Sequence, residues 1–233
     1  MNRRARAEWA ALEREIIACE RCPRLRSWCR QVAAERVRRY ASETYWGLPV
    51  PGFGDPEGRL WIVGLAPAAH GANRTGRLFT GDRSGDFLFA ALHRAGFANR
   101  PTARRRDDGL VLRDAWISPI VRCAPPANRP TAEEIANCRP FLVRELRLLA
   151  PRLAAVVALG HAAHQGWLAA WAEAGGAVPR PRPRFAHGAE HDLGAGLRLF
   201  DAYHPSQQNT FTGRLTPAML DAIFAAARTH LRG

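Results

Sequence analysis

The sequence has 233 residues and a formal charge of +13, from 34 arginines against 21 acidic residues, and it contains no lysine. A chain of this length can bury one good core, no apolar run approaches the roughly 20 residues of a membrane span, and the arginine-rich N-terminus lacks the apolar region of a secretory signal. We therefore expect one domain, 1–233, that is cytoplasmic, monomeric and free of membrane contacts. The excess of positive charge is typical of proteins that bind nucleic acid, although part of it can be ordinary solvated surface.

Hydrophobic periodicity predicts helices and strands that alternate along most of the chain. The expected helices are Ala5–Ala18, Leu25–Tyr40, 84–95, a segment from Thr131 to about Leu149, Gly160–Trp171 and Leu215–Leu231. The expected strands are Leu60–Val63, Trp116–Val121, Leu153–Leu159 and Leu197–Tyr203. Thr131 and Glu134 form a capping box, Pro119 marks a strand end or an edge strand, and the prolines within 175–188 predict a long loop. This order predicts an α/β fold, a three-layer α/β/α sandwich around a parallel sheet.

A glycine-rich loop follows the first strand and reads G-L-A-P-A-A-H-G-A-N-R-T-G-R-L-F-T-G-D-R-S-G-D from Gly64 to Asp86. It lies at the carboxyl end of its strand, where open α/β sheets bind ligands. Its glycines allow the backbone to approach a ligand closely. It cannot be a Walker loop, because lysine is absent, and its glycines lack the spacing of a dinucleotide motif.

A second polar segment, H-P-S-Q-Q-N-T-F-T-G-R-L-T, begins at His204 where the last strand ends. Cysteines form a third pattern, in which Cys19 and Cys22 are a C-x2-C pair and Cys123 and Cys138 lie far downstream. Disulfides are disfavoured in a reducing compartment, whereas structural zinc and an iron-sulfur cluster both accept four thiolates. Cys29 falls outside the pattern, and we interpret it as an ordinary buried or half-buried thiol.

Together these three patterns resemble the uracil-DNA glycosylase superfamily, and in particular its family 5, whose members carry an iron-sulfur cluster. The resemblance implies a central four-stranded parallel sheet and N-terminal helices pinned by a four-iron, four-sulfur (4Fe-4S) cluster on Cys19, Cys22, Cys123 and Cys138. It also implies a monofunctional DNA glycosylase that hydrolyses the N-glycosidic bond of uracil and other deaminated bases in DNA and leaves an abasic site for base excision repair. Without lysine, a lyase reaction lacks its usual amine.

The same resemblance assigns catalytic roles to His204, Asp82 and Asn128. A His204 donor can stabilise the charge on O2 of the departing uracil. Asp82 is the candidate that orients water, because Ala66 stands where other families place an aspartate. A helix cap is an almost equally good interpretation of Asp82, and a turn residue is the plain alternative for Asn128.

Further roles concern the base and the DNA backbone. The substrate-binding candidates are Ala66, Pro67, Ala68, His70, Phe79 and Asn209, with Phe79 as the aromatic platform for the flipped base. The DNA-binding candidates are Arg74, Arg77, Gln207, Gln208 and Arg214. Pro119 stands where family 4 has an asparagine, so we expect looser discrimination that admits hypoxanthine, xanthine and modified cytosines. The alternatives are a non-catalytic iron-sulfur or zinc module that binds damaged or single-stranded DNA, and a redox protein.

Overall fold

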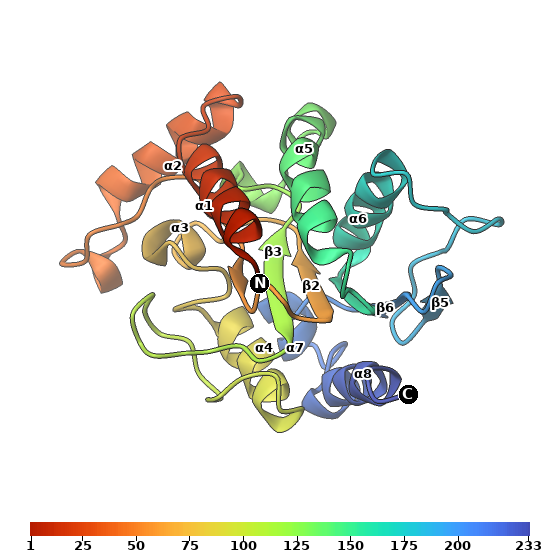
Figure 1. The fold of residues 1–233 in the computed structure, drawn as a ribbon. Coiled ribbons are helices and arrows are strands. Elements are labelled where there is room, and N and C mark those ends of the chain that lie inside the picture. Colours follow the sequence, from red (N-terminus) through yellow and green to blue (C-terminus); the bar gives the residue numbers. More distant parts are fainter.

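A six-stranded sheet forms the centre of the molecule in the order β1-β3-β2-β4-β6-β5. The computed structural model describes all residues, Met1–Gly233, and Figure 1 shows the sheet between two groups of helices. The strands are β1 Phe53–Gly54, β2 Leu60–Gly64, β3 Ala115–Pro119, β4 Ala155–Leu159, β5 Glu190–Asp192 and β6 Arg198–Ala202. β3, β2, β4 and β6 are parallel, as expected. β1 and β5 add antiparallel edges that the sequence did not predict.

The helices match the predicted pattern, with three differences. Their bounds are α1 Arg3–Ile17, α2 Pro23–Glu35, α3 Ala72–Thr75, α4 Arg83–Arg94, α5 Ala132–Leu149, α6 His161–Glu173, α7 Gln207–Phe211 and α8 Pro217–His230. α2 stops at Glu35 because Arg36 adopts a positive φ of 52°, and a separate 3-10 turn, Arg38–Tyr40, follows. α3 and α7 are short helices within the two segments that we expected to be loops. The capping box of Thr131 and Glu134 at the start of α5 is confirmed.

The sheet has an apolar core on each face, which confirms the three-layer arrangement. Ile62 belongs to a core that includes Phe89 of α4 and Phe224 of α8. Its neighbour Trp61 belongs to the opposite core, which includes Leu142 of α5 and Trp167 of α6. This alternation follows from the two-residue period of a strand. No helix is long and apolar enough to cross a membrane.

The four parallel strands end at one edge of the sheet, and this carboxyl edge carries both polar segments. From β2 the chain crosses to β3 on one side, and from β4 it crosses to β6 on the other side. A crevice is expected where the crossing direction reverses, between β2 and β4. The segment after β2 and the segment after β6 therefore meet above the centre of the sheet.

Candidate active site

Phe79 and His204 face each other at the carboxyl edge of the sheet. Their ring centroids are 6.0 Å apart with an interplanar angle of 35°. Phe79 comes from the segment after β2, and His204 lies two residues beyond the end of β6. An aromatic face and an imidazole are thus brought together from segments 125 residues apart in sequence, as residues 79 and 204.

Close backbone approach holds this pair in place, and three glycines permit it. A Cβ at Gly64, the last residue of β2, would lie 3.1 Å from Cζ of Phe79, and a Cβ at Gly160 would lie 3.4 Å from Cβ of His204. A Cβ at Gly85 would lie only 1.9 Å from the carbonyl oxygen of Phe79. Phe79 itself adopts a positive φ of 50°. Such strain in a non-glycine residue is typical of functional sites.

The surroundings of His204 favour the neutral form of its imidazole at physiological pH. Burial lowers its pKa to about 4, because desolvation disfavours the charged form. The amide of Asn209 donates to the carbonyl oxygen of His204 across 2.8 Å. Asn209 therefore supports the backbone of His204 from within α7. A neutral imidazole can donate one N–H hydrogen bond to a ligand oxygen without adding a charge.

Asp82 caps α4 and also lies near the Phe79 backbone. Its Oδ1 accepts a hydrogen bond from the backbone N–H of Gly85 across 2.8 Å, so the cap interpretation is confirmed. Its Oδ2 would lie 2.0 Å from a Cβ at Gly71, so glycine there is needed to accommodate the carboxylate. Burial raises the pKa of Asp82 against the opposing effect of the Gly85 hydrogen bond. One carboxylate oxygen is thus occupied by the cap, whereas the other lies against the backbone of Gly71.

Arg74 is engaged in contacts within the protein. It is 5% exposed and donates to the carbonyl oxygens of His70 and Gly81 across 2.8 and 2.9 Å. It also pairs with Glu43 and lies over the ring of Tyr40. These contacts hold the segment after β2 in shape, and they argue against the expected contact with phosphate.

Arg77 is likewise buried, at 6% exposed. It donates twice to the carboxylate of Asp108, across 2.8 and 2.9 Å, and once to Thr80 across 2.9 Å. Burial opposes ionisation of Asp108, but backbone N–H donors from Leu110 and Arg104, together with Arg77, lower its pKa to about 2. Arg77 therefore ties the segment after β2 to the loop containing 104–110.

Four further residues expected at the site differ in exposure and in their contacts: Gln207, Gln208, Arg214 and His70. Gln207, Gln208 and Arg214 are exposed, and Arg214 lies over the ring of Tyr203, 4.5 Å from its centroid. His70 is paired through Nδ1 with the hydroxyl of Tyr45 at 3.1 Å. Burial and the nearby Arg39 and Arg74 lower its pKa. These groups border the segments that carry Phe79 and His204.

Ala66, Pro67 and Ala68 begin the segment after β2. Pro67 is buried, Ala66 and Ala68 are half-buried, and the carbonyl oxygen of Ala68 accepts the backbone N–H groups of Gly71 and Asn73. Asn128 is exposed in a turn with a positive φ of 57°. Its side chain makes no hydrogen bond to Phe79, Asp82 or His204. This geometry fits the turn interpretation of Asn128 better than the catalytic one.

An arginine-lined groove beside Asp82 was not predicted. Its volume is about 630 Å³, and its exposed basic lining comprises Arg39, Arg83, Arg104 and Arg105. In the sequence the Arg104–Arg106 run is a charged excursion of the kind that is most often solvated surface. The backbone N–H of Gly81 donates to the carbonyl oxygen of Ala103 across 2.8 Å, which brings this run to the site. Phe211 of α7, 65% exposed, lies under Arg83 and was not predicted either.

The cysteines gather on the face of the sheet that carries α5. Cys22, Cys123, Cys138 and Cys29 belong to one apolar cluster, and Cys19 lies beside a smaller cluster with Phe141 of α5. Burial raises the pKa of Cys138 to about 11, and the Cys22 and Cys19 thiols contribute to this rise. The only group of three or more metal-binding side chains within 4.8 Å of one another is His164, His191 and Asp201. No three cysteine sulfurs therefore lie within 4.8 Å of one another, although the side chains of Cys29 and Cys123 are hydrogen-bonded to each other. The buried thiol expected of Cys29 is confirmed.

Comparison with known proteins defines the class. Residues 51–228 match the family model described as the uracil DNA glycosylase superfamily. A type-5 uracil-DNA glycosylase of Mycobacterium leprae is 54% identical over 93% of this chain and 93% of its own length. The type-5 enzyme of Mycobacterium tuberculosis is 55% identical over 91% of this chain and 78% of its own length. That of Thermus thermophilus is 46% identical over 94% of this chain and 96% of its own length. The chain therefore belongs to the uracil-DNA glycosylase superfamily, in its type-5 family.

Proposed function

We propose that this protein is a monofunctional DNA glycosylase that removes uracil, and also hypoxanthine, xanthine and modified cytosines, from DNA. The observation that carries the proposal is the pairing of neutral His204 with Phe79 at the carboxyl edge. A base must leave the helical stack before its glycosidic bond can be reached. Phe79 offers a stacking face for the flipped base, and stacking of this kind contributes about 1–3 kcal/mol.

His204 supplies stabilisation of the leaving group. When the glycosidic bond of uracil breaks, negative charge develops on the base, and an N–H donor in a site that excludes water stabilises that charge. A neutral imidazole is suited to this task because it retains one N–H group that can donate to the oxygen where the charge develops. The position two residues after Gly64, where other families place the aspartate that orients water, is occupied here by Ala66.

Asp82 is the carboxylate that can act on the attacking water. Its cap hydrogen bond uses Oδ1, so in this proposal the water binds Oδ2, the oxygen that lies beside Gly71. Burial raises its pKa, which makes it a better proton acceptor. The groove lined by Arg39, Arg83, Arg104 and Arg105 runs past this carboxylate and can hold the phosphates of the strand that carries the base. Asn128 stays a weaker candidate for the same chemistry.

We also infer that Cys19, Cys22, Cys123 and Cys138 hold a 4Fe-4S cluster. Two of the sulfurs accept N–H groups, Cys138 from the backbone of Arg122 at 3.5 Å and Cys22 from Asn137 at 3.7 Å, as cluster-bound sulfurs commonly do. When bound, the cluster would link α1 and α2 to α5 as a structural element.

Metal analysis tests the cluster. Anaerobically purified protein should contain about four iron atoms per chain, and Cys138→Ser should lose them. Cys29→Ser is the matched control, because Cys29 is also a buried thiol of the same apolar cluster. One zinc per chain without iron would refute the inference.

Base release tests the catalytic proposal. Labelled oligonucleotides that contain uracil, hypoxanthine, xanthine or a modified cytosine should yield the free base and an intact strand with an abasic site. An oligonucleotide with only normal bases is the control. Tight binding without release of any base would favour a non-catalytic DNA-binding module instead.

A further inference from the structure

An arginine-proline segment, Arg180–Arg184, projects from the loop between α6 and β5 and reads R-P-R-P-R. Arg180, Arg182 and Arg184 are exposed. None of the three forms a salt bridge with a carboxylate, in contrast to Arg74 and Arg77. The intervening prolines restrict the backbone, so less conformational entropy is lost when such a segment binds a ligand. We call residues 180–184 the arginine arm.

A buried network fixes the base of the arm. Nδ1 of His164 lies 2.7 Å from Oδ1 of Asp201, and its Nε2 lies 3.1 Å from the carbonyl oxygen of Pro183. His191 contacts the other carboxylate oxygen of Asp201 at 3.0 Å. His164 and Asp201 are fully buried. Each ring nitrogen of His164 already faces an oxygen acceptor, so the cluster is explained as a hydrogen-bond network that anchors the arm.

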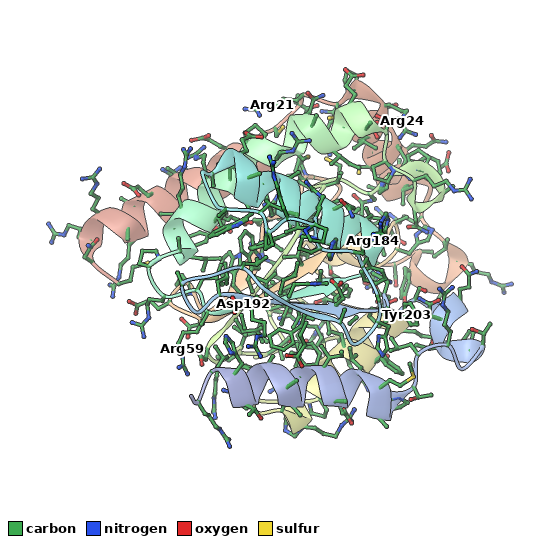
Figure 2. The ribbon with its side chains drawn as sticks, turned by 90° about the vertical axis from the view of Figure 1, so that its right-hand side faces the viewer. Arg21, Arg24, Arg59, Arg184, Asp192 and Tyr203 are labelled. Atoms are coloured by element: carbon green, nitrogen blue, oxygen red, sulfur yellow. The ribbon has the colours of Figure 1, made fainter.

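The residues that follow the arm contact Tyr203 at the carboxyl edge of the sheet. Phe185 lies 6.2 Å from Tyr203 between ring centroids, and His187 stacks on Tyr203 at 4.7 Å. The backbone N–H of Tyr203 donates to Nδ1 of His187 across 3.0 Å. Arg214 contacts the same Tyr203 ring, and His204 follows in sequence. Figure 2 shows Arg184 and Tyr203 on one side of the molecule, opposite Arg59, which precedes β2.

We propose that the arginine arm is a DNA-backbone contact, in which Arg180, Arg182 and Arg184 bind phosphates of the DNA beside the flipped nucleotide. The inference rests on the proposed function, because it takes DNA as the ligand of the adjoining edge. Charge complementarity supports it, since three guanidinium groups without a carboxylate partner are held on a proline-restricted segment that is joined through Phe185 to Tyr203, the residue before His204. The arm adds phosphate contacts on the β6 side of the site, whereas the arginine-lined groove lies beside Asp82 in the segment after β2.

The salt dependence of DNA binding tests the arm. The ligand is a duplex that contains a stable abasic-site analogue, so that binding requires no catalysis. The slope of log affinity against log salt is negative, and its magnitude decreases by about 0.9 for each phosphate that the protein no longer neutralises. The variant R180A/R182A/R184A should therefore show a slope smaller by about two to three units, and R180K/R182K/R184K should keep the wild-type slope.

A matched control uses three exposed arginines at the other edge of the sheet. Arg3, Arg4 and Arg6 begin α1, where the Met1 amino group pairs with Glu57 just before β2. R3A/R4A/R6A should change the slope by less than about half a unit. A reduction of less than about one unit in the arm variant, or an equal reduction in this control, would overturn the proposal. Failure of the wild-type protein to release bases would instead refute the proposed function, and the slopes would still test the arm.

Discussion

His204 is a single residue whose environment sets both its chemistry and a pH dependence of stability. Its ordinary pKa of 6.5 is lowered to about 4 by burial in the folded protein. Between these two pH values the unfolded chain binds a proton at His204 that the folded protein does not bind. The free energy of unfolding should therefore fall as the pH is lowered from 6.5 toward 4.

Chemical denaturation at about pH 7 and about pH 5 measures this effect. His204→Gln keeps a polar side chain without a titrating group, so its unfolding free energy should fall less over the same interval. His93, which is exposed on α4, provides the control, and His93→Gln should behave as the wild type. Equal pH dependence in all three proteins would contradict the assignment of His204 as a half-buried imidazole that its surroundings keep neutral.

Asp82 combines a helix cap with the proposed catalytic carboxylate, and substitution can separate these roles. Asparagine caps a helix about as well as aspartate, so Asp82→Asn should retain the wild-type unfolding free energy, whereas Asp82→Ala should lose about 1 kcal/mol. If the carboxylate acts on water, both variants should lose about 10²-fold or more in single-turnover base release. Full activity of Asp82→Asn would show that Asp82 serves only as a helix cap and does not act on the attacking water.

At the scale of elements, Arg77 and Arg214 exemplify opposite uses of the same residue type. Arg77 ties the segment after β2 to the loop around Asp108, and its removal leaves a carboxylate without its partner. Arg77→Ala should therefore cost about 3 kcal/mol of stability, with an unchanged salt slope in DNA binding. Arg214 is exposed near α7, so Arg214→Ala should keep the stability and lower the slope by about one unit.

Denaturation and salt titration of both variants provide the comparison. If Arg77→Ala kept the wild-type stability but showed a reduced salt slope, Arg77 would be a phosphate contact despite its burial. An unchanged slope in Arg214→Ala would remove Arg214 from the DNA-binding surface.

The central elements were predictable because their sequences carry strong local signals. Leu60–Val63 and Leu153–Leu159 are continuous apolar runs, and the corresponding β2 and β4 are buried along their whole length. The edge strands were not predictable. β5 is a partly exposed strand of three polar residues. β1 is a two-residue strand in a proline- and glycine-rich segment. Both pair with strands that are already formed, so tertiary contacts rather than local pattern create them.

The parts of the site that depend on distant partners were also beyond the sequence. The positions of Phe79 and His204 followed from motifs at strand ends. The burial of Arg74 and Arg77 could not be predicted from sequence motifs. Their carboxylate partners, Glu43 and Asp108, each lie 31 residues away in the chain. The anchor of the arginine arm joins His164 to Asp201 across 37 residues. Charged residues are exposed by default, so only the folded structure reveals such exceptions.

At the scale of the whole molecule, the net charge of +13 supplies two basic surfaces that border one reaction centre. The arginine-lined groove lies beside Asp82. The arginine arm is joined through Phe185 to Tyr203, which directly precedes His204 in sequence. The proposed function therefore predicts that DNA binding and base cleavage are separable: substitution of the arginines should weaken binding, whereas substitution of a few side chains at the carboxyl edge should stop cleavage.

Leaving-group stabilisation by His204 can be tested by single-turnover release of free uracil from a labelled duplex, compared for the wild type, His204→Ala and His93→Ala. The wild type and His93→Ala should release uracil at equal rates. His204→Ala should be slower by about 10²–10³-fold while retaining wild-type affinity for abasic-site DNA. A full rate of uracil release by His204→Ala would contradict the central claim that the site works by stabilising the departing base.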